Sequence, residues 1–563
     1  MVELRIAFAG HIRPEDLGDL GAIDLGLSRA FGLIASALPL GAELVTGLAG
    51  GADLHAARAW RAAGLGAIHA VFPFLDMEVP ADALALAVKQ TWLDGASVEA
   101  AGHNPYLTQA RWVVEDADLL VVVWTGDPGR GAGGTADSVR LALDRNTPVL
   151  WVKPGEPGNI RYISPDALEP DFGFLEVIEQ LEDGSAPLVV DATQMMLADH
   201  FQQVKDQLTP PPVGVGPSYG RLRQRLDWVL DRSLWRAFAL YKSVMAGRAR
   251  PSTRKSVPVP ATLALQPGFK LLQEAYDAAD QEAGGLASVH RSQQVFQVSV
   301  MIAAAAVGST PAVWPEIKIY AVLVELSLAL ATFAVWRFSV RSERTRRWSE
   351  ARRVAEQLRL EQAAWALGLS TRDDRRYPVE GPASQAAAYW RRRAGQAVGR
   401  FDVERTRVWG EWALDALIAD QVEYHQRQGR LNAHLSHRGH EIETTVFWMF
   451  VAFLALFAGA WFTAHAVDFE LPHWLGGLVL MAGAVTPAFG AASLALDSAL
   501  SFADQGRRSE DMRRRLSALH ARLESDMGLE AQRRAARAAV RMQVSQEDRW
   551  SDDTAHRHVV RGG

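Results

Sequence analysis

The chain contains no cysteine among its 563 residues. This absence excludes disulfide bonds, thiolate nucleophiles and every zinc or iron–sulfur site that needs cysteine ligands. An excess of basic residues is also absent, because 59 lysines and arginines stand against 65 aspartates and glutamates, giving a formal net charge of −6. This balance disfavours a globally basic nucleic-acid binder, and we expect no nucleic-acid partner.

Several catalytic motifs are missing as well. The sequence has no His-Glu-x-x-His zinc motif, no EF-hand loop and no serine nucleophile elbow, so it predicts neither a metal site nor serine hydrolysis. It also lacks Gly-x-Gly-x-x-Gly and the lysine-bearing P-loop, which disfavours ordinary NAD or ATP binding. Residues 1–10 lack the charged and apolar regions of a cleavable signal peptide, and we expect the N-terminal domain to stay in the cytoplasm.

Short apolar runs alternate with helix-length segments over roughly the first 200 residues. Strands separated by helices predict an α/β fold with a doubly wound parallel sheet. Helices are expected after Asp16, Asp53, Ala81, Asn104 and Thr135, several with an N-capping side chain. The predicted strands are residues 4–9, 43–46, 67–72, 119–124, 149–152 and 188–190.

The chain changes character after this region. A proline-rich linker at 208–217 ends it, and apolar residues at helical spacing from Leu222 to Phe238 predict an amphipathic helix. Further on, four apolar stretches approach the roughly 20 residues needed to cross a bilayer. They are residues 295–313, 319–336, 444–464 and 474–496. They predict an α-helical membrane module with four transmembrane helices in two hairpins; the alternative is four buried helices of a large soluble core.

Arginines predict the orientation of these spans. The short connections at 310–318 and 465–473 hold few basic residues, whereas arginine-rich segments follow the second and fourth spans. The positive-inside rule therefore predicts a multi-pass protein of the inner (cytoplasmic) membrane, with long cytoplasmic helices and both termini in the cytoplasm.

Three glycine-bearing turns follow predicted strands, at 9–11, 46–53 and 125–135. Ligands bind at strand ends in open α/β sheets, where glycine lets the backbone approach a phosphate and the next helix N-terminus attracts it. Three such turns at one sheet edge predict one ligand crevice. The candidate ligand-binding residues are Gly10, His11, Gly47, Gly50, Gly51, Asp53, Gly126, Arg130, Gly133, Gly134 and Thr135.

Some of these residues have two interpretations. His11 either contacts a ligand phosphate or ribose or caps its turn. Asp53 either holds a ribose hydroxyl or is the N-cap of a helix over residues 54–63. Asp127 and Arg130 belong to a lid-like loop, with or without direct contact to the ligand.

The α/β region resembles the SLOG superfamily of Rossmann-like domains, which includes the lonely-guy and DNA-processing-protein families. The resemblance covers about residues 1–195 and implies that nucleotides or nucleotide-derived signals bind at the glycine turns. Lonely-guy enzymes use a glutamate where this chain has Ser138, and a proline where it has Arg130. The resemblance therefore implies a ligand sensor without a cofactor and not an enzyme. It rests on Gly10-His11, the run Val-Thr-Gly-Leu-Ala-Gly-Gly-Ala-Asp at 45–53, Phe-Pro-Phe at 72–74, and 118–124 leading into Gly133-Gly134-Thr135.

Residues 280–283, 290–292, 348–359 and 420–425 lie in the segments that flank the predicted spans. On these residues the membrane half resembles SLATT-type effector domains, which partner SLOG sensors in bacterial conflict systems. The resemblance implies a protein that opens a pore or disrupts the lipid bilayer in antiviral defence. The signal would be a nucleotide second messenger made by a partner enzyme, such as a cyclic nucleotide or an ADP-ribose derivative. We expect a homo-oligomer.

Two residues inside the spans are candidate membrane or pore residues. Glu325 either lines a pore or lies near the outer interface, bonded to a neighbour. Pro487 should kink the fourth span, either as a gating hinge or for packing alone. Two alternatives to the sensor remain: a membrane-anchored nucleotide hydrolase using Asp137 or Asp53, and a constitutive channel or scaffold.

Together these features divide the chain into six parts. They are a SLOG-like ligand-sensing domain at 1–205, a linker with an amphipathic helix at 206–262, a cytoplasmic helix and first hairpin at 263–340, a cytoplasmic helical stalk at 341–443, a second hairpin at 444–500, and a C-terminal cytoplasmic helix and tail at 501–563.

Overall fold

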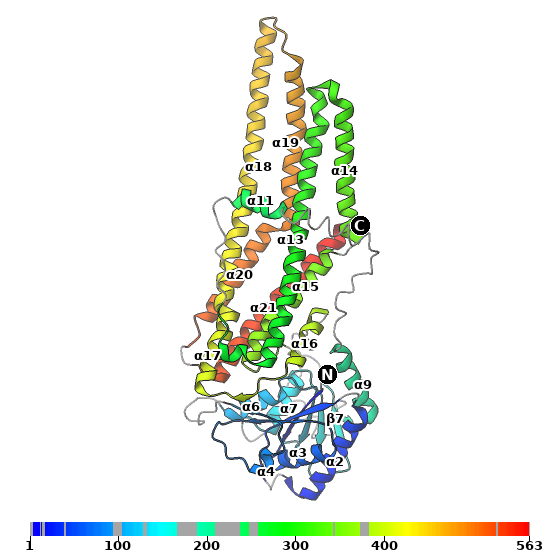
Figure 1. Cartoon of the computed structure of the whole chain (residues 1–563), viewed down its shortest axis with the longest axis vertical. Helices are drawn as coiled ribbons and strands as arrows, with labels where there is room; N and C mark the ends of the chain where they lie inside the picture. The colour runs from blue at the N-terminus through cyan, green and yellow to red at the C-terminus, as the bar shows by residue number, and fades with distance from the viewer. Residues whose placement is uncertain are drawn as a thin grey trace.

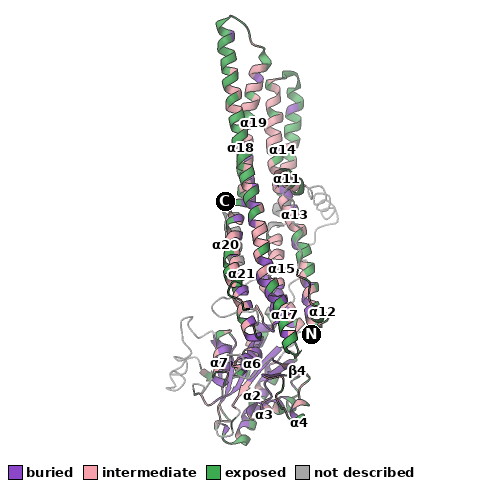
Figure 2. Ribbon diagram, turned by 90° about the vertical axis from the view of Figure 1, so that its left-hand side faces the viewer, coloured by how far each residue is buried: buried purple, intermediate pink, exposed green. Residues whose placement is uncertain are grey.

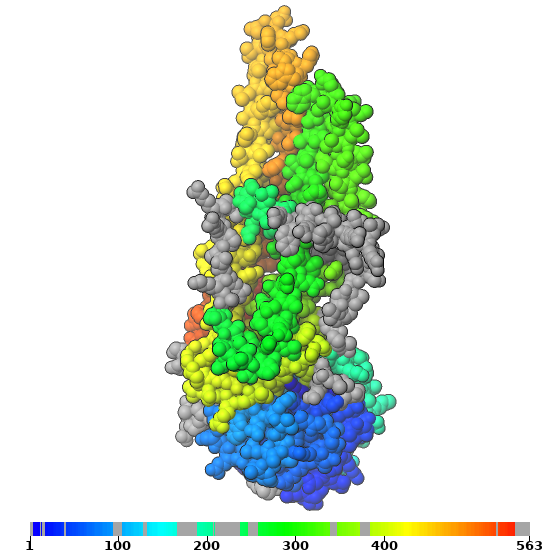
Figure 3. Space-filling view, viewed as in Figure 1, coloured from blue at the N-terminus to red at the C-terminus, as the bar shows by residue number. Residues whose placement is uncertain are grey.

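A computed structural model gives the arrangement of the chain. It describes residues 4–11, 13, 17–38, 41–93, 104–127, 132–165, 189–208, 237–246, 257–341, 344–371, 382–524 and 527–561. An α/β domain lies at one end of the molecule, and long helices extend from it (Figure 1). In the space-filling view these helices form two neighbouring columns above the domain (Figure 3).

A mostly parallel sheet of nine strands forms the α/β domain, in the order β8-β7-β6-β5-β1-β2-β3-β4-β9. The strands are β1 (Leu4–Gly10), β2 (Ala42–Thr46), β3 (Ile68–Phe72), β4 (Lys89–Trp92), β5 (Leu119–Val123), β6 (Val149–Val152), β7 (Ile160–Ile163), β8 (Val189–Asp191) and β9 (Gly399–Arg400). The prediction of a doubly wound α/β sheet is confirmed, but β4, β7 and β9 were not predicted.

The expectation of a purely parallel sheet is wrong at β7, which pairs antiparallel with both β6 and β8. The connection from Val152 to Ile160 is a short turn with Gly155 in the left-handed region at φ +81°. A short turn can join antiparallel neighbours only, since parallel strands need a crossover of a dozen or more residues.

Helices cover both faces of this sheet. The helices α2 (Leu20–Ala37), α3 (Ala52–Ala62) and α9 (Gln194–Gln207) pack on one face, and α6 (Pro105–Val114) and α7 (Thr135–Asp144) pack on the other. A short helix, α4 (Ala81–Leu84), precedes β4. The predicted N-cap at Asn104 is confirmed, because its side chain accepts a hydrogen bond from the Tyr106 backbone N–H at 2.9 Å.

The rest of the described chain is helical. Its helices are α11 (Ala237–Ala246), α12 (Ala261–Ala264), α13 (Pro267–Ser309), α14 (Lys318–Arg341), α15 (Arg344–Ala366), α16 (Pro382–Ala394), α17 (Val403–Leu414), α18 (Asp420–Ala466), α19 (His473–Leu500), α20 (Phe502–His520) and α21 (Leu529–Arg561), with 3₁₀ turns η2 (Thr310–Ala312) and η3 (Pro315–Ile317) and a π-helical turn η4 (Asp415–Ala419). Most of the predicted amphipathic helix at 222–238 lies outside the described residues.

All four predicted spans are helical, in α13, α14, α18 and α19. The outer parts of these helices expose large apolar side chains such as Leu330, Phe333, Leu456 and Leu480. Exposed residues are frequent in the upper part of the ribbon in Figure 2. Five helices of the described chain are long and apolar enough to cross a membrane, and the fifth is α2. In this structure α2 packs against the sheet, with seven residues buried.

Between the α/β domain and these outer ends lies a group of helices that we call the stalk bundle. It comprises α13 before residue 295, α15, α16, α17, η4, α18 before residue 444, α20 and α21. One hydrophobic core runs from the α6 face of the sheet into this bundle. The bundle also supplies β9, which pairs in parallel with β4. The two regions are therefore packed as one structure.

Candidate functional site

A cavity of about 390 Å³ opens where the strand order of the sheet reverses. The chain builds β2, β3 and β4 on one side of β1, and β5 and β6 on the other. The crevice at such a reversal, outside the carboxyl ends of the strands, is where open α/β sheets bind ligands. The end of β1 contributes Gly10 and His11 to the wall, and the end of β5 contributes Trp124 and Thr125.

Most of the predicted ligand-binding residues meet at this cavity. Those that line it are Gly10, His11, Gly47, Asp53, Gly133, Gly134 and Thr135, joined by Asp127. Gly50, Gly51 and Gly126 do not line it, and Arg130 lies outside the described residues. Four further residues line the cavity and were not predicted, because they lie outside glycine-rich turns: Arg13, Met77, Tyr106 and Gln109.

Two of the glycines are required by close packing. Gly133 has φ +87°, and a Cβ there would lie 2.4 Å from the backbone nitrogen of Leu107. A Cβ on Gly10 would lie 2.5 Å from the Cβ of Ala52. Both distances are far below van der Waals contact, so these glycines let the N-termini of α6 and α3 approach the strand ends.

His11 connects the turns after β1 and β5. Its Nε2 accepts a hydrogen bond from the Thr125 backbone N–H at 3.2 Å, and its carbonyl accepts one from the Ala52 N–H at 3.1 Å. The Thr125 hydroxyl in turn donates to Asp127 at 2.9 Å. His11 therefore orders the turns while its ring also borders the cavity, so its two predicted interpretations are compatible.

Asp53 places a buried carboxyl in the cavity wall. It lies inside the first turn of α3, whose N-cap is Gly51, so its interpretation as an N-cap is wrong. The side chain is buried, and Oδ1 has no hydrogen-bond partner among the described residues. Burial raises the pKa of Asp53 to about 7, against the lowering effect of the Ala49 and Gly10 backbone N–H groups. Near neutral pH this carboxyl can both donate and accept a proton.

The position that matches the lonely-guy glutamate is occupied by Ser138, whose hydroxyl contacts the Gly134 carbonyl at 3.5 Å. The neighbouring carboxylate, Asp137, accepts from the Gly133 N–H at 2.7 Å and from Arg140 at 2.9 Å. Asp137 does not line the cavity. Among the described residues, the carboxyl groups in the cavity wall are therefore those of Asp53 and Asp127.

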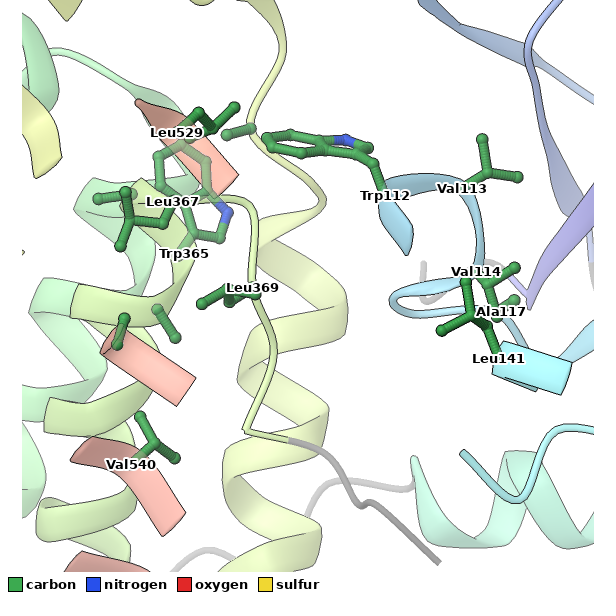
Figure 4. Close-up of a cluster of buried hydrophobic side chains, with 14 of the residues drawn as sticks. Trp112, Val113, Val114, Ala117, Leu141, Trp365, Leu367, Leu369, Leu529 and Val540 are labelled. Atoms are coloured by element: carbon green, nitrogen blue, oxygen red, sulfur yellow. The ribbon is translucent and has the colours of Figure 1, made fainter. Parts of the chain in front are cut away.

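Helix α6 separates this cavity from the stalk bundle. Tyr106, Gln109, Ala110 and Val113 line the cavity from one side of the helix. On its opposite side, the Thr108 hydroxyl and the Arg111 guanidinium both contact the Glu530 carboxylate of α21. Trp112, on that same side, reaches toward Leu367 and Leu529 of the bundle (Figure 4).

A buried ion-pair cluster continues this interface beyond the end of α6. Glu115 accepts from Arg145 at 2.9 Å, and from two arginines of α21, Arg533 at 3.0 Å and Arg537 at 2.9 Å. Burial alone raises the pKa of Glu115, but the three guanidinium groups outweigh it and hold the pKa at about 2. Glu115 is therefore a permanent anion shared between the α/β domain and α21.

Two aspartates extend the cluster toward α16. Asp116 contacts Arg5 at 2.9 Å and Arg391 at 2.7 Å, and Asp118 contacts Arg392 at 2.6 Å. The sequence analysis did not select these residues. One feature of the sequence could have indicated them: three of the four residues at 115–118 (Glu-Asp-Ala-Asp) are acidic and directly precede a fully apolar strand.

The two membrane candidates lie in different surroundings. The carboxylate of Glu325 in α14 packs on Gly308 of α13, where an added Cβ would lie 3.0 Å from Oε2. This group therefore faces α13, the other helix of the first hairpin. Pro487 lies within α19, which runs without a break from His473 to Leu500.

No known protein family model matches the chain, and no curated protein matches it in sequence. The resemblances to SLOG and SLATT proteins remain predictions.

Proposed function

We propose that the protein is a membrane-embedded effector whose α/β domain senses a nucleotide-derived ligand and whose membrane helices respond by opening a pore or disrupting the bilayer. The observation that carries this proposal is the position of α6. One side of this helix lines the cavity, and the other side is bonded to α21 of the stalk bundle. A ligand that contacts Tyr106 or Gln109 therefore acts on a helix that is also part of the interface.

The cavity suits a nucleotide derivative. The N-termini of α3 and α7 border it at Asp53 and Thr135, and free N–H groups at helix N-termini favour phosphate. Tyr106 offers an exposed aromatic ring for a base, and Asp53 offers an unpartnered oxygen for a hydroxyl. These features agree with the ligand class that the SLOG resemblance implies, a cyclic nucleotide or an ADP-ribose derivative.

A continuous set of contacts leads from α6 to the membrane helices. α21 packs on α17 and α20, and α20 packs along α18 and follows α19 directly at Ser501. Because the two apolar hairpins are extensions of this bundle, a shift of α6 changes the packing beneath them. For the ligand to act, it must bind the active arrangement more tightly than the resting one.

We place four of the apolar helices, in two hairpins, in the inner membrane, with the α/β domain and the stalk bundle in the cytoplasm. The burial of α2 against the sheet supports leaving that helix out. The distribution of arginines supports the orientation. We further propose a homo-oligomer acting in antiviral defence, with a partner enzyme that makes the signal, on the basis of the SLATT resemblance.

The raised pKa of Asp53 favours a second candidate function. A carboxyl group with a pKa of about 7 is suited to proton transfer. A membrane-anchored nucleotide hydrolase with Asp53 as the working acid or base would use the same cavity. It would release a free base from its ligand, whereas a sensor would release the ligand unchanged.

The test uses the full chain in neutral detergent and measures the shift of its Tm with AMP, cyclic nucleotides and cyclic ADP-ribose isomers. Gly134→Trp should abolish the shift, because the residue lines the cavity and its extended backbone (φ −79°) accepts a side chain. Gly50→Trp is the matched control, since a Cβ on Gly50 meets only open space.

Three outcomes separate the candidates. A shift lost in Gly134→Trp but kept in Gly50→Trp, with the ligand recovered intact and dye released from liposomes only with ligand, supports the sensor. Recovery of free base supports the hydrolase. Dye release that is independent of ligand and unchanged in Gly134→Trp would contradict both candidates and leave a constitutive channel.

A further inference from the structure

A second cavity, of about 470 Å³, lies inside the stalk bundle. Its wall comes from α13, α15, α18 and α20, with contributions from α11 and α21. Its volume falls within the range of roughly 300–1,000 Å³ that is usual for small-molecule sites. No residue is shared with the cavity of the α/β domain. It is therefore a separate candidate site.

Positive charge dominates the wall of this second cavity. Four arginines line it, namely Arg291, Arg352, Arg359 and Arg508, against two carboxylates, those of Asp280 and Glu356. Glu356 is already engaged, because Arg352 and Arg359 both donate to it. The wall therefore carries four guanidinium groups against two carboxylates, one of which is shared by two of the arginines.

Arg291 is the least compensated of these arginines. No carboxylate among the described residues makes an ion pair with it, and its guanidinium carbon lies 5.5 Å from the centre of the Phe238 ring. Burial lowers the pKa of Arg291, and the positive charge of Arg352 lowers it further, while Tyr424 acts in the opposite direction. A partly buried cation near another cation is stabilised when an anion binds between them.

Neutral hydrogen-bonding groups complete the wall. His425 presents a buried Nδ1 that has no hydrogen-bond partner among the described residues. Burial lowers the pKa of His425 to about 4, against the raising effect of Glu356, so the ring is neutral at physiological pH. The wall also contains the Tyr424 hydroxyl and five glutamines. The Gln543 amide nitrogen already donates to the Leu417 and Ala539 carbonyls, and the amide groups of the other four glutamines can bond to ligand oxygens.

The second cavity lies next to the ends of the predicted spans that adjoin the stalk bundle. Arg291 precedes the first span, at 295–313, by about one helical turn of α13. Arg508 lies in α20, which begins at Phe502 just after the fourth span. An anion in this position would contact the bases of both hairpins.

We infer that this stalk cavity binds a phosphate group, held by Arg291 and Arg508 and by the neutral donors of Tyr424 and the glutamines. Guanidinium groups pair with phosphate through parallel N–H···O bonds, which explains a wall with several arginines. The phosphate belongs either to a phospholipid headgroup entering from the membrane or to a soluble phosphate compound. The inference does not depend on the function proposed for the first cavity.

The experiment measures binding to the full chain carrying Gly134→Trp, so that the first cavity does not contribute. In detergent, the probe is radiolabelled pyrophosphate in equilibrium dialysis. In nanodiscs, the probe is phosphatidylglycerol against phosphatidylcholine, with retained lipid counted by native mass spectrometry. Arg291→Gln and Arg508→Gln are the test variants. Arg507→Gln is the matched control, because Arg507 is 80% exposed and does not line the cavity.

Saturable binding of either probe, weakened about tenfold or more in both test variants and unchanged in the control, is the expected result; tenfold corresponds to about 1.4 kcal/mol. Binding of pyrophosphate indicates a soluble ligand, and selective retention of phosphatidylglycerol indicates a headgroup. Two results would overturn the inference: neither probe binds, or Arg507→Gln loses as much binding as the test variants. Each variant's Tm is measured alongside, so that unfolding is not mistaken for lost binding.

Discussion

Arg392 in α16 and Asp118, directly before β5, form a buried ion pair of 2.6 Å, although 274 positions separate them in the sequence. Arg392 also donates to the backbone carbonyl of Asp116 at 2.9 Å. The other oxygen of Asp118 accepts from the Arg5 backbone N–H at 2.8 Å. This ion pair therefore joins the α/β domain to the stalk bundle at the residue before β5. A rotation of the domain against the bundle must break it.

Removing one partner of this pair should strongly destabilise the protein. Arg392→Met removes a guanidinium partner of the buried Asp118 carboxylate, and loss of one member of a buried ion pair costs about 3–5 kcal/mol. We expect a lower Tm and a lower denaturant midpoint in detergent. The neighbour Arg393, which contacts Tyr389 on the surface, is the matched control, and Arg393→Met should cost about 1 kcal/mol or less. Equal losses in the two variants would contradict the assignment.

The Glu115 cluster predicts sensitivity to acid. The pKa of Glu115 in the folded protein, about 2, lies below its ordinary value of 4.5. Its contribution to stability, on the order of 3 kcal/mol, is therefore fully present above pH 4.5 and is lost as the pH falls toward 2. Glu115→Gln should be less stable than the wild type at pH 6, and the difference should shrink below pH 4.5.

The measurement is the Tm of both proteins from pH 7 to pH 2.5. Glu510→Gln is the control, because Glu510 pairs with Arg513 and Arg514 on the surface of α20, where solvent screens the charges. Its Tm should follow that of the wild type. A constant difference between wild type and Glu115→Gln across this range would show that Glu115 does not act through its charge.

Much of the fold was predictable because its signals are local. The strand β5 is Leu-Leu-Val-Val-Val, buried on both faces, and such a run marks a central parallel strand. In contrast, β4 (Lys-Gln-Thr-Trp) contains mostly polar residues and has no apolar pattern. The two-residue β9 forms only through pairing with β4, more than 300 positions away, so no local signal could predict it.

The candidate site was predictable to the extent that it consists of glycine turns. Gly10 and Gly133 were predicted because they lie in glycine-bearing turns near predicted strand ends, and close packing explains why glycine is required there. Gln109 and Tyr106 were missed, because their role follows from the side of α6 that faces the sheet. The arginines of the second cavity also come from separate helices, and only tertiary packing brings Arg291 and Arg508 to the wall of the same cavity.

Asp53 should make the stability of the protein depend on pH in the opposite direction to Glu115. Its pKa in the folded protein, about 7, lies above the ordinary 3.8, so the folded state binds more protons between these values. Stability should therefore fall as the pH rises from 4 to 7. Asp53→Asn removes the charge, so its Tm should exceed that of the wild type at pH 8, and this advantage should disappear toward pH 4. Exposed Asp82→Asn is the control, and its Tm should follow the wild type throughout; parallel curves for Asp53→Asn and wild type would contradict the assignment.

Gly477 marks a position where the two hairpins pack directly against each other. This residue of α19 is buried against the connection of the first hairpin, and a Cβ there would lie 2.1 Å from the carbonyl oxygen of Ala312. Gly477→Leu must therefore push the hairpins apart, with an expected cost of about 1–3 kcal/mol from overpacking. The adjacent Gly476 has open space around its Cβ position, so Gly476→Leu adds the same side chain without a clash.

The comparison of these two leucine variants separates packing between the hairpins from hydrophobicity within the membrane. In nanodiscs, Gly477→Leu should lower the Tm by several degrees and Gly476→Leu should not. If ligand-dependent dye release requires the hairpins to act together, Gly477→Leu should also lose it while keeping its ligand-induced Tm shift, because the first cavity is untouched. Equal Tm values for the two variants would show that the hairpins do not pack at Gly477 in the bilayer.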